Sequence, residues 1–179
     1  MAAESCWNSV ERQRIFFDLD GVLAVWQEVP LEEVAKEGYF SSLPAQENVV
    51  KAFIFLEQYS DIRLYILSSV FMDGHSVSDK KIWASAHLGL PECRQLYWPY
   101  GQEKAMAIEQ IGGMRKSDVL VDDFSRNLHN WPGIPVKLYN GINGTKGTWE
   151  GYSVHSSMKP EILARQIYAI AKIERNMVL

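Results

Sequence analysis

The sequence has few cysteines and no long hydrophobic run, and each absence excludes a class of protein. Only two of its 179 residues are cysteines, Cys6 and Cys93, and their spacing is not typical of a metal site or a disulfide framework. They indicate ordinary thiols in a reducing compartment. No apolar run approaches the length of a membrane span, and the N-terminal residues lack the apolar core of a secretory signal. We therefore expect a cytoplasmic protein with no membrane partner.

Positive charge is also scarce. The 18 lysines and arginines are outnumbered by 22 acidic residues, which gives a formal net charge of −4. No cluster of basic residues is present, so the sequence argues against a face that binds duplex nucleic acid. Small anionic substrates are still compatible with this balance, because a bound divalent cation can dominate the local charge. The composition gives no indication of the oligomeric state.

The order of apolar and periodic segments predicts an α/β fold. Apolar runs bounded by turn residues alternate with segments of helical periodicity, the pattern of a mostly parallel sheet flanked by helices. The predicted strands are 15–19, 62–67, 95–98, 119–121 and 136–139. The predicted helices are 47–58, 79–88, 102–111 and 161–177. The length and the hydrophobic content of 47% suit a single domain over residues 1–179.

Residues 22–46 do not follow this alternation. The segment contains proline, glycine and serine around a short helical patch at 31–36. Because it leaves the sheet directly after the first strand, it would lie over the strand ends, where open α/β sheets bind ligands. We interpret it as a small cap insertion, and the alternative is a plain connecting loop. Three of its aromatic residues are candidates either for substrate contacts or for packing: Trp26, Tyr39 and Phe40.

Asp18 and Asp20 follow the first apolar run, and Gly21 comes directly after them. A buried carboxylate without a partner is costly, so acids at the end of a buried strand are tolerated mainly where a cation or a solvated cleft receives them. Side chains alternate along a strand, so both acids should point the same way and could share one metal and one substrate. The alternative is a pair of loop acids before a turn.

Polar residues also follow the later apolar runs. Ser68 and Ser69 come after the second predicted strand, where hydroxyls and free backbone N–H groups can bind phosphate oxygens, although serines are also common turn formers. Lys104 lies near the start of the third predicted helix, where a lysine is usually solvated. Asp122 and Asp123 follow the fourth predicted strand, and adjacent acids at a second buried strand end are hard to explain as packing.

In this order, the motifs resemble those of the haloacid dehalogenase (HAD) superfamily. The resemblance covers residues 15–139 and comprises Asp-x-Asp-Gly after the first strand, serine after the second, a lysine on a later helix and Asp-Asp after the fourth. It implies a HAD-type, Rossmann-like sheet and, as in most members, Mg²⁺-dependent phosphoryl transfer. Within the superfamily, the sequence looks most like the 5'(3')-deoxyribonucleotidases at residues 81–89, at Lys104 and at residues 119–123. Segment 22–46 is shorter than the helical cap of those enzymes, which leaves the substrate open.

The resemblance implies a role for each motif residue. Asp18 would be the nucleophile that forms an aspartyl-phosphate, and Asp20 would be the general acid and base. Mg²⁺ would be bound by Asp18, the main-chain carbonyl of Asp20 and the acid pair, with Asp123 as the direct ligand and Asp122 supporting it. The phosphoryl oxygens would be bound by Ser68, Ser69 and Lys104.

Three further residues are alternatives or additions to this assignment. Lys80 and Lys81 could take the role of the lysine, but they come too early in the motif order. Asn127 follows the acid pair and could order its loop through the amide, or could simply face solvent at the start of a helix. The glycine-rich segment 140–145 could line the same cleft, although loop closure alone would explain its composition.

The expected function is hydrolysis of a phosphomonoester, with Mg²⁺ as cofactor. The leading substrate is a nucleoside monophosphate or a similar small phosphorylated metabolite. The alternative is a catalytically silent binding or regulatory module that has kept the HAD fold, because a fold alone never establishes activity.

Overall fold

Six strands form one sheet in the order β3-β2-β1-β4-β5-β6, and every neighbouring pair is parallel. The computed structural model describes residues 12–142 and 149–177. Its strands are β1 (Gln13–Phe17), β2 (Ile62–Val70), β3 (Gln95–Pro99), β4 (Val119–Asp122), β5 (Ile134–Tyr139) and β6 (Tyr152–His155). This strand order is that of the Rossmann fold, so the predicted α/β class is confirmed.

Helices cover both faces of the sheet, and the alternation of side chains along β1 shows why. Ile15 and Phe17 belong to a buried cluster with side chains of α2 (Glu47–Leu56), α3 (Ser76–Leu88) and α5 (Pro160–Met177). Phe16 points to the other face, where it packs with residues of the 3₁₀ helix η3 (Lys104–Ile111) and of α4 (Ser125–His129). Burial on both faces explains why the strands are continuous apolar runs.

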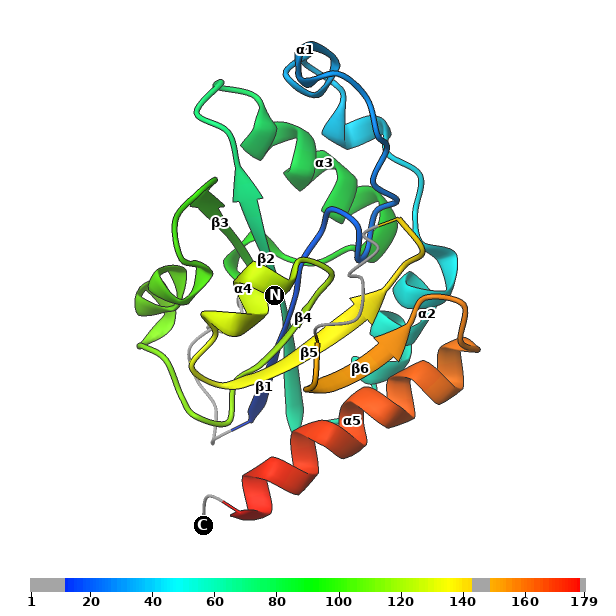
Figure 1. Ribbon diagram of the computed structural model, residues 1–179, viewed down its shortest axis with the longest axis vertical. Helices are drawn as coiled ribbons and strands as arrows, with labels where there is room; N and C mark the ends of the chain where they lie inside the picture. Colours follow the sequence, from blue (N-terminus) through cyan, green and yellow to red (C-terminus); the bar gives the residue numbers. More distant parts are fainter. Residues whose placement is uncertain (1–11, 143–148, 178–179) are drawn as a thin grey trace, which may run out of the picture.

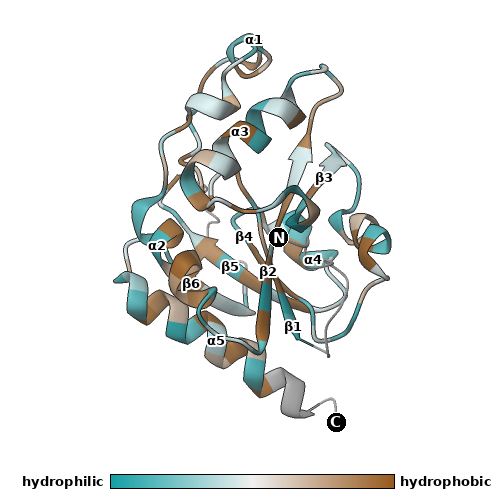
Figure 2. Cartoon of the chain, turned by 180° about the vertical axis from the view of Figure 1, so that it is seen from behind, coloured by the Kyte–Doolittle hydropathy of each residue, from teal (hydrophilic) through white to brown (hydrophobic). Residues whose placement is uncertain are grey.

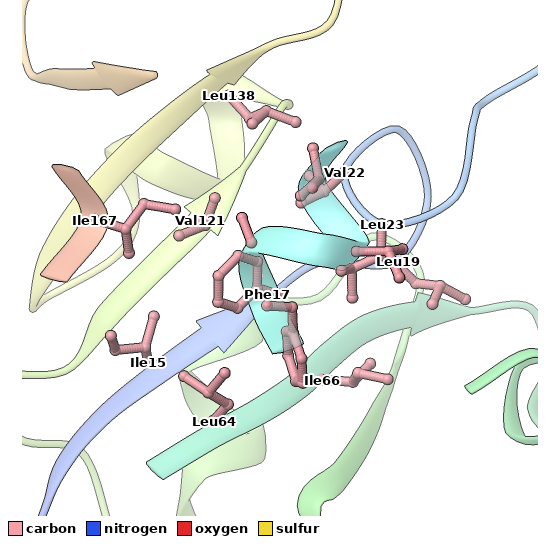
Figure 3. Close-up of a cluster of buried hydrophobic side chains, with 14 of the residues drawn as sticks. Ile15, Phe17, Leu19, Val22, Leu23, Leu64, Ile66, Val121, Leu138 and Ile167 are labelled. Carbon is pink, nitrogen blue, oxygen red and sulfur yellow. The ribbon is translucent and has the colours of Figure 1, made fainter. Parts of the chain in front are cut away.

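The larger cluster lies between the sheet and α2, α3 and α5. Figure 3 shows Ile15, Phe17 and Val121 of the strands near Ile167 of α5. Phe17 and Phe53 of α2 meet edge to face, with their ring centroids 5.2 Å apart. Truncation of a buried phenylalanine typically costs about 3–5 kcal/mol, so this contact contributes strongly to the free energy of folding. In Figure 2, α5 carries hydrophilic residues between the hydrophobic ones, as expected of a helix with one exposed side.

The carboxyl ends of the strands form the end of the molecule at which the site lies. The arrowhead of β2 points toward the end where α1 (Leu31–Val34) and α3 lie (Figure 1). β1 is the central strand at which the direction of strand order reverses, since β2 and β4 flank it on either side. A crevice opens at such a switch point in open α/β sheets, because the connections leave in opposite directions.

Several element boundaries differ from the prediction. β1 ends at Phe17, so Asp18 follows the strand and Asp20 lies in a turn, where it forms an isolated bridge with Ala24. The two acids are therefore not alternate positions of one strand, as was predicted, although both line the same cavity. β2 extends to Val70, which places both serines inside the strand instead of after it. The third predicted helix is the 3₁₀ helix η3, and β6 was not predicted.

The segment 22–46 is attached to α3. It contains α1 and the 3₁₀ turn η1 (Phe40–Ser42), and the main-chain N–H of Gly38 donates to Asp79 of α3 at 2.8 Å. The indole N–H of Trp83 donates to the carbonyl of Leu43, also at 2.8 Å. A second short turn, η2 (Glu92–Arg94), precedes β3.

Cys93 is disulfide-bonded. The interpretation of the cysteines as ordinary thiols is therefore wrong for this residue, while Cys6 lies outside the described residues. Disulfides are rare in reducing compartments, so the cysteines no longer indicate such a compartment. Within the described residues, no helix has both the length and the apolar composition of a membrane span.

Candidate active site

Three buried carboxylates meet at the carboxyl ends of β1 and β4. One oxygen each of Asp18, Asp122 and Asp123 lies within 4.8 Å of the others. Asp18 directly follows β1, and Asp122 is the last residue of the neighbouring strand β4. The N–H of Asp18 donates to the carbonyl of Val121 at 3.0 Å, which continues the pairing of the two strands into the site. Pairing of adjacent parallel strands thus brings Asp18 close to Asp122, which lies 104 residues later in the sequence.

Lys104 lies between two of these carboxylates. Its Nζ is 2.8 Å from Oδ2 of Asp18 and 2.7 Å from Oδ2 of Asp122, and its side chain is buried. Burial alone would lower the pKa of Lys104, but the negative charges of Asp122 and Asp18 raise it above its ordinary value. Lys104 is therefore a permanent cation in contact with both acids. Of the lysines considered from the sequence, it is the one that contacts Asp18.

Burial raises the pKa of the Asp18 carboxyl to about 6. Lys104 opposes this rise, whereas the negative charges of Asp122 and Asp20 add to it. Burial is thus the main reason that the charged form of Asp18 is unfavourable. A cation or a bound proton would compensate its charge.

The two acids at the end of β4 have different surroundings. Both oxygens of Asp122 accept hydrogen bonds from the protein: Oδ1 from the N–H of Phe124 at 2.7 Å, and Oδ2 from Lys104 and from the amide of Asn127 at 3.0 Å. The amide of Asn127 therefore orders this loop. Asp123 Oδ2 accepts a hydrogen bond from the amide of Asn140 at 2.8 Å.

Asn140 and Gly21 fix the position of Asp123. The amide nitrogen of Asn140 also donates to the carbonyl of Gly21 at 2.7 Å, which ties the turn after β1 to the loop after β5. Gly21 has a φ of +78°, and a Cβ there would lie 2.2 Å from Oδ2 of Asp123. Only glycine allows this approach. Of the predicted glycine-rich segment 140–145, residues 143–145 lie outside the described part of the chain.

Asp20 is not part of the carboxylate cluster but lies beside it. Its Oδ2 accepts a hydrogen bond from Nζ of Lys80, which also donates to Oγ of Ser68 at 3.0 Å and to the carbonyl of Ser69 at 2.5 Å. Ser68 is completely buried, whereas Ser69 is partly exposed. Lys81, the other lysine considered from the sequence, forms an exposed ion pair with Glu92.

A cavity of about 250 Å³ opens beside the acids. Asp18, Asp20 and Asp123 line it at the polar end, and Ser69, Val70 and Asn127 also contribute. Its remaining walls are aromatic: Trp26, Phe40, Phe71, Tyr100 and Phe124. Two of the three predicted cap residues, Trp26 and Phe40, thus lie at the cavity. Tyr39 is not among its lining residues and packs edge to face against both of those rings.

A second cavity of about 250 Å³ adjoins the first and is more polar. The two share Ser69, Tyr100, Phe124 and Asn127. Lys104 lies in the wall of the second cavity, together with Arg126 and Asn130. The site is therefore an open cleft with an aromatic part and a polar part on either side of Tyr100 and Phe124.

The sequence reasoning missed several of these residues. Phe71, Tyr100 and Phe124 each follow within two residues of the end of β2, β3 and β4. Aromatic residues directly after buried strands were the signal that could have identified them, because strand ends line the crevice of such a sheet. Asn140 could have been found in the same way after β5. The contacts of Lys80 depend on the packing of α3 and leave no local signal in the sequence.

Comparison with known proteins supports the fold. A crystal structure of a protein from Mesorhizobium loti, proposed to be a HAD-like phosphatase, superposes with a TM-score of 0.57. The match covers 89% of this chain and 88% of the other at 11% sequence identity. No protein-family model and no curated protein matches the sequence. At this identity the likeness shows a shared Rossmann-type α/β fold.

Proposed function

We propose that this chain is a Mg²⁺-dependent phosphomonoester hydrolase that works through an aspartyl-phosphate on Asp18. The observation that carries the proposal is the buried cluster of Asp18, Asp122 and Asp123, whose oxygens lie within 4.8 Å of one another. The proposed phosphatase activity of the structural neighbour is consistent with it.

The residues of the cluster fit a magnesium ion. Carboxylate oxygens are the ligands that Mg²⁺ prefers, and burial makes the charged form of Asp18 unfavourable unless a cation lies nearby. Asp18, Asp123 and the main-chain carbonyl of Asp20 would bind the ion. Asp122 would support them, because both of its oxygens already accept hydrogen bonds from the protein. When bound, Mg²⁺ neutralises charge on the phosphoryl group and orients it.

Each remaining residue has a place in the proposed reaction. An oxygen of Asp18 forms a bond to phosphorus as the bond to the leaving oxygen breaks. Asp20 gives a proton to that oxygen and later takes one from the water that hydrolyses the aspartyl-phosphate. Lys104 and the two serines, Ser68 and Ser69, would bind the phosphoryl oxygens and stabilise the charge that spreads over them in the transition state.

The aromatic part of the cleft favours a substrate with a planar leaving group. Trp26, Phe40, Phe71, Tyr100 and Phe124 form walls that can pack against a nucleobase. Tyr100 is 69% exposed and Phe124 is 49% exposed, which is consistent with a contact made only when a ligand is present. We therefore propose a nucleoside monophosphate as the substrate.

Phosphate release tests the proposal. The purified chain is assayed with p-nitrophenyl phosphate, with nucleoside 5'- and 3'-monophosphates and with sugar phosphates, each with Mg²⁺ and with EDTA. We expect Mg²⁺-dependent release that is fastest with one of the nucleotides. Asp18→Asn should lower kcat by about 1,000-fold or more, because it removes the nucleophile. The matched control is Asp61→Asn, which changes an acid that pairs with Lys172 outside the site.

Two results would contradict the proposal in different ways. Activity that persists in Asp18→Asn would show that another group attacks phosphorus. No release from any substrate by the intact chain would support a catalytically silent binding module on the same fold.

A further inference from the structure

Lys80 is a fully buried lysine that the proposed reaction does not use. It lies in the second turn of α3, and its exposed fraction is 0%. Removing an ammonium group from water is costly unless all of its hydrogens find partners. If this position served only packing, an apolar side chain would fill it without the cost of burying a charge. The charge of Lys80 therefore requires an explanation.

The partners of Lys80 supply that explanation. Its Nζ donates to Oδ2 of Asp20, to Oγ of Ser68 at 3.0 Å and to the carbonyl of Ser69 at 2.5 Å. These three acceptors match the three hydrogens of an ammonium group. The nitrogen also lies 4.3 Å from the ring centroid of Phe40, within the range of a cation–π contact.

These partners come from three separate segments. Asp20 lies in the turn after β1, the serines lie at the end of β2, and Phe40 lies in the 22–46 segment. Lys80 therefore fixes the positions of these segments relative to one another. Lys104 contacts a different pair of acids, Asp18 and Asp122. Lys104 thus contacts the proposed nucleophile, and Lys80 contacts the proposed general acid.

The contact with Lys80 distinguishes the two oxygens of Asp20. Oδ2 is bound to Lys80, whereas Oδ1 is buried and has no hydrogen-bond partner in the described part of the chain. Asp20 lines the same cavity as Asp18. A carboxyl group held through one oxygen has its rotation restricted, so Lys80 fixes how the carboxyl group of Asp20 is oriented beside the cavity.

We infer that Lys80 is a positioning residue, which holds Asp20 by Oδ2 so that the carboxyl group can give its proton to the leaving oxygen. The inference rests on the proposed function. As the bond from Asp18 to phosphorus forms, the electron pair of the breaking bond goes to the leaving oxygen, which takes the proton of Asp20. The carboxylate left behind is neutralised by Lys80.

The dependence of the rate on the leaving group tests this role. An alkoxide needs a proton as it leaves, whereas p-nitrophenolate is stable without one. In Lys80→Met, we expect kcat/KM for an alkyl phosphomonoester to fall by about 100-fold, the size of a lost general-acid contribution. For p-nitrophenyl phosphate, kcat/KM should fall much less. This ratio reports the transfer to Asp18 and does not include the later hydrolysis, in which Asp20 acts as the base for every substrate. Lys80→Arg, which keeps the charge, should restore part of the alkyl activity.

Two further variants complete the experiment. Lys81→Met changes the neighbouring lysine, which pairs with Glu92 at the surface, and should leave both rates unchanged. Asp20→Asn/Lys80→Met removes both charges together, which avoids an unpaired buried carboxylate if Lys80→Met alone does not fold. Its alkyl activity should equal that of Asp20→Asn, because a residue that acts through Asp20 has no effect once that acid is gone.

The outcomes separate this inference from the proposed function. Equal losses of kcat/KM on both substrates, a Lys80→Met variant that behaves as Lys81→Met does, or a double variant well below Asp20→Asn would overturn the role of Lys80 alone. A wild-type chain without turnover would overturn the proposed function and this role with it.

Discussion

At the scale of single residues, the protonation of Asp18 sets the electrostatic state of the site. Burial raises its pKa to about 6, above the ordinary value of 3.8. The folded chain therefore binds this proton more tightly than the unfolded chain does. The resulting contribution to stability is fully present below about pH 3.8 and is lost as the pH rises through about 6. At neutral pH the metal-free chain carries an unfavourable carboxylate.

Asp18→Asn should therefore stabilise the metal-free chain at pH 7 while it abolishes hydrolysis. The free energy of unfolding should rise by up to about 3 kcal/mol, the equivalent of the raised pKa. The gain should be absent at pH 4, where Asp18 is protonated in the folded chain. Urea denaturation in EDTA at both pH values measures the difference. A variant that is less stable than the wild type at pH 7 would contradict the assigned protonation of Asp18.

Gly21 is the second residue at which a small change should have a large effect. An alanine Cβ would overlap Asp123 Oδ2, so Gly21→Ala should displace this carboxylate and weaken metal binding by about tenfold or more. The control is Gly38→Ala. Gly38 also has a positive φ, +87°, but a Cβ there would meet no atom within 4 Å. Titration with Mn²⁺, followed by electron paramagnetic resonance, compares the two, and equal affinities would show that Asp123 does not bind the metal.

At the scale of elements, the 22–46 segment is held to α3 by specific hydrogen bonds. Asp79 is 3% exposed and accepts from the N–H of Gly38, and Trp83 donates to the carbonyl of Leu43. His75 at the start of α3 contacts the carbonyl of Ala35 at 2.8 Å. A segment with these attachments positions Trp26 and Phe40 at the cavity through α3, the same helix that carries Lys80.

Asp79→Ala should loosen this attachment. The change leaves the N–H of Gly38 without its acceptor, which typically costs about 1–3 kcal/mol when the group is buried. We expect faster amide hydrogen exchange across residues 31–43 and a higher KM for the substrate. Asp79→Asn keeps an acceptor oxygen and should behave nearly as the wild type does. Unchanged exchange in Asp79→Ala would show that other contacts hold the segment.

The strength of the local signal decided which elements could be predicted from the sequence. Ile15–Phe17 and Val119–Val121 are buried on both faces, so their apolar runs identified central strands. β6 was missed because Val154 is its only buried residue. The acids and Lys104 were proposed from the order of the motifs, which can be read from the sequence without coordinates. The contacts of Lys80 were not, since they depend on how α3 packs against β2 and on the turn after β1.

At the scale of the whole molecule, the two ends of the sheet carry different kinds of polar contact. The carboxyl ends hold the acids, whereas a buried ion pair joins segments at the amino ends. Arg14 at the start of β1 contacts both oxygens of Asp118, at 2.5 and 2.8 Å, and also donates to the carbonyls of Ile111 and Gly113. This network ties β1, the end of η3 and the start of β4 together, far from the proposed chemistry.

Asp118→Ala should therefore destabilise the chain without impairing the site. Loss of one partner of a buried pair typically lowers the free energy of unfolding by about 3–5 kcal/mol, because the other charge is left uncompensated. Arg14→Met/Asp118→Leu should lose less. Urea denaturation measures both variants, and kcat is compared at a temperature at which each is folded. A fall in kcat of the folded variants would show that the two ends of the sheet are coupled.

Trapping of the phosphorylated residue tests the central claim most directly. The chain is quenched with acid during turnover with Mg²⁺, reduced with borohydride and digested, and the peptide that contains residue 18 is analysed by mass spectrometry. Borohydride reduces an acyl phosphate to an alcohol, so Asp18 should be converted to homoserine only when substrate is present. Turnover without modification at Asp18, or modification at another acid, would contradict the account.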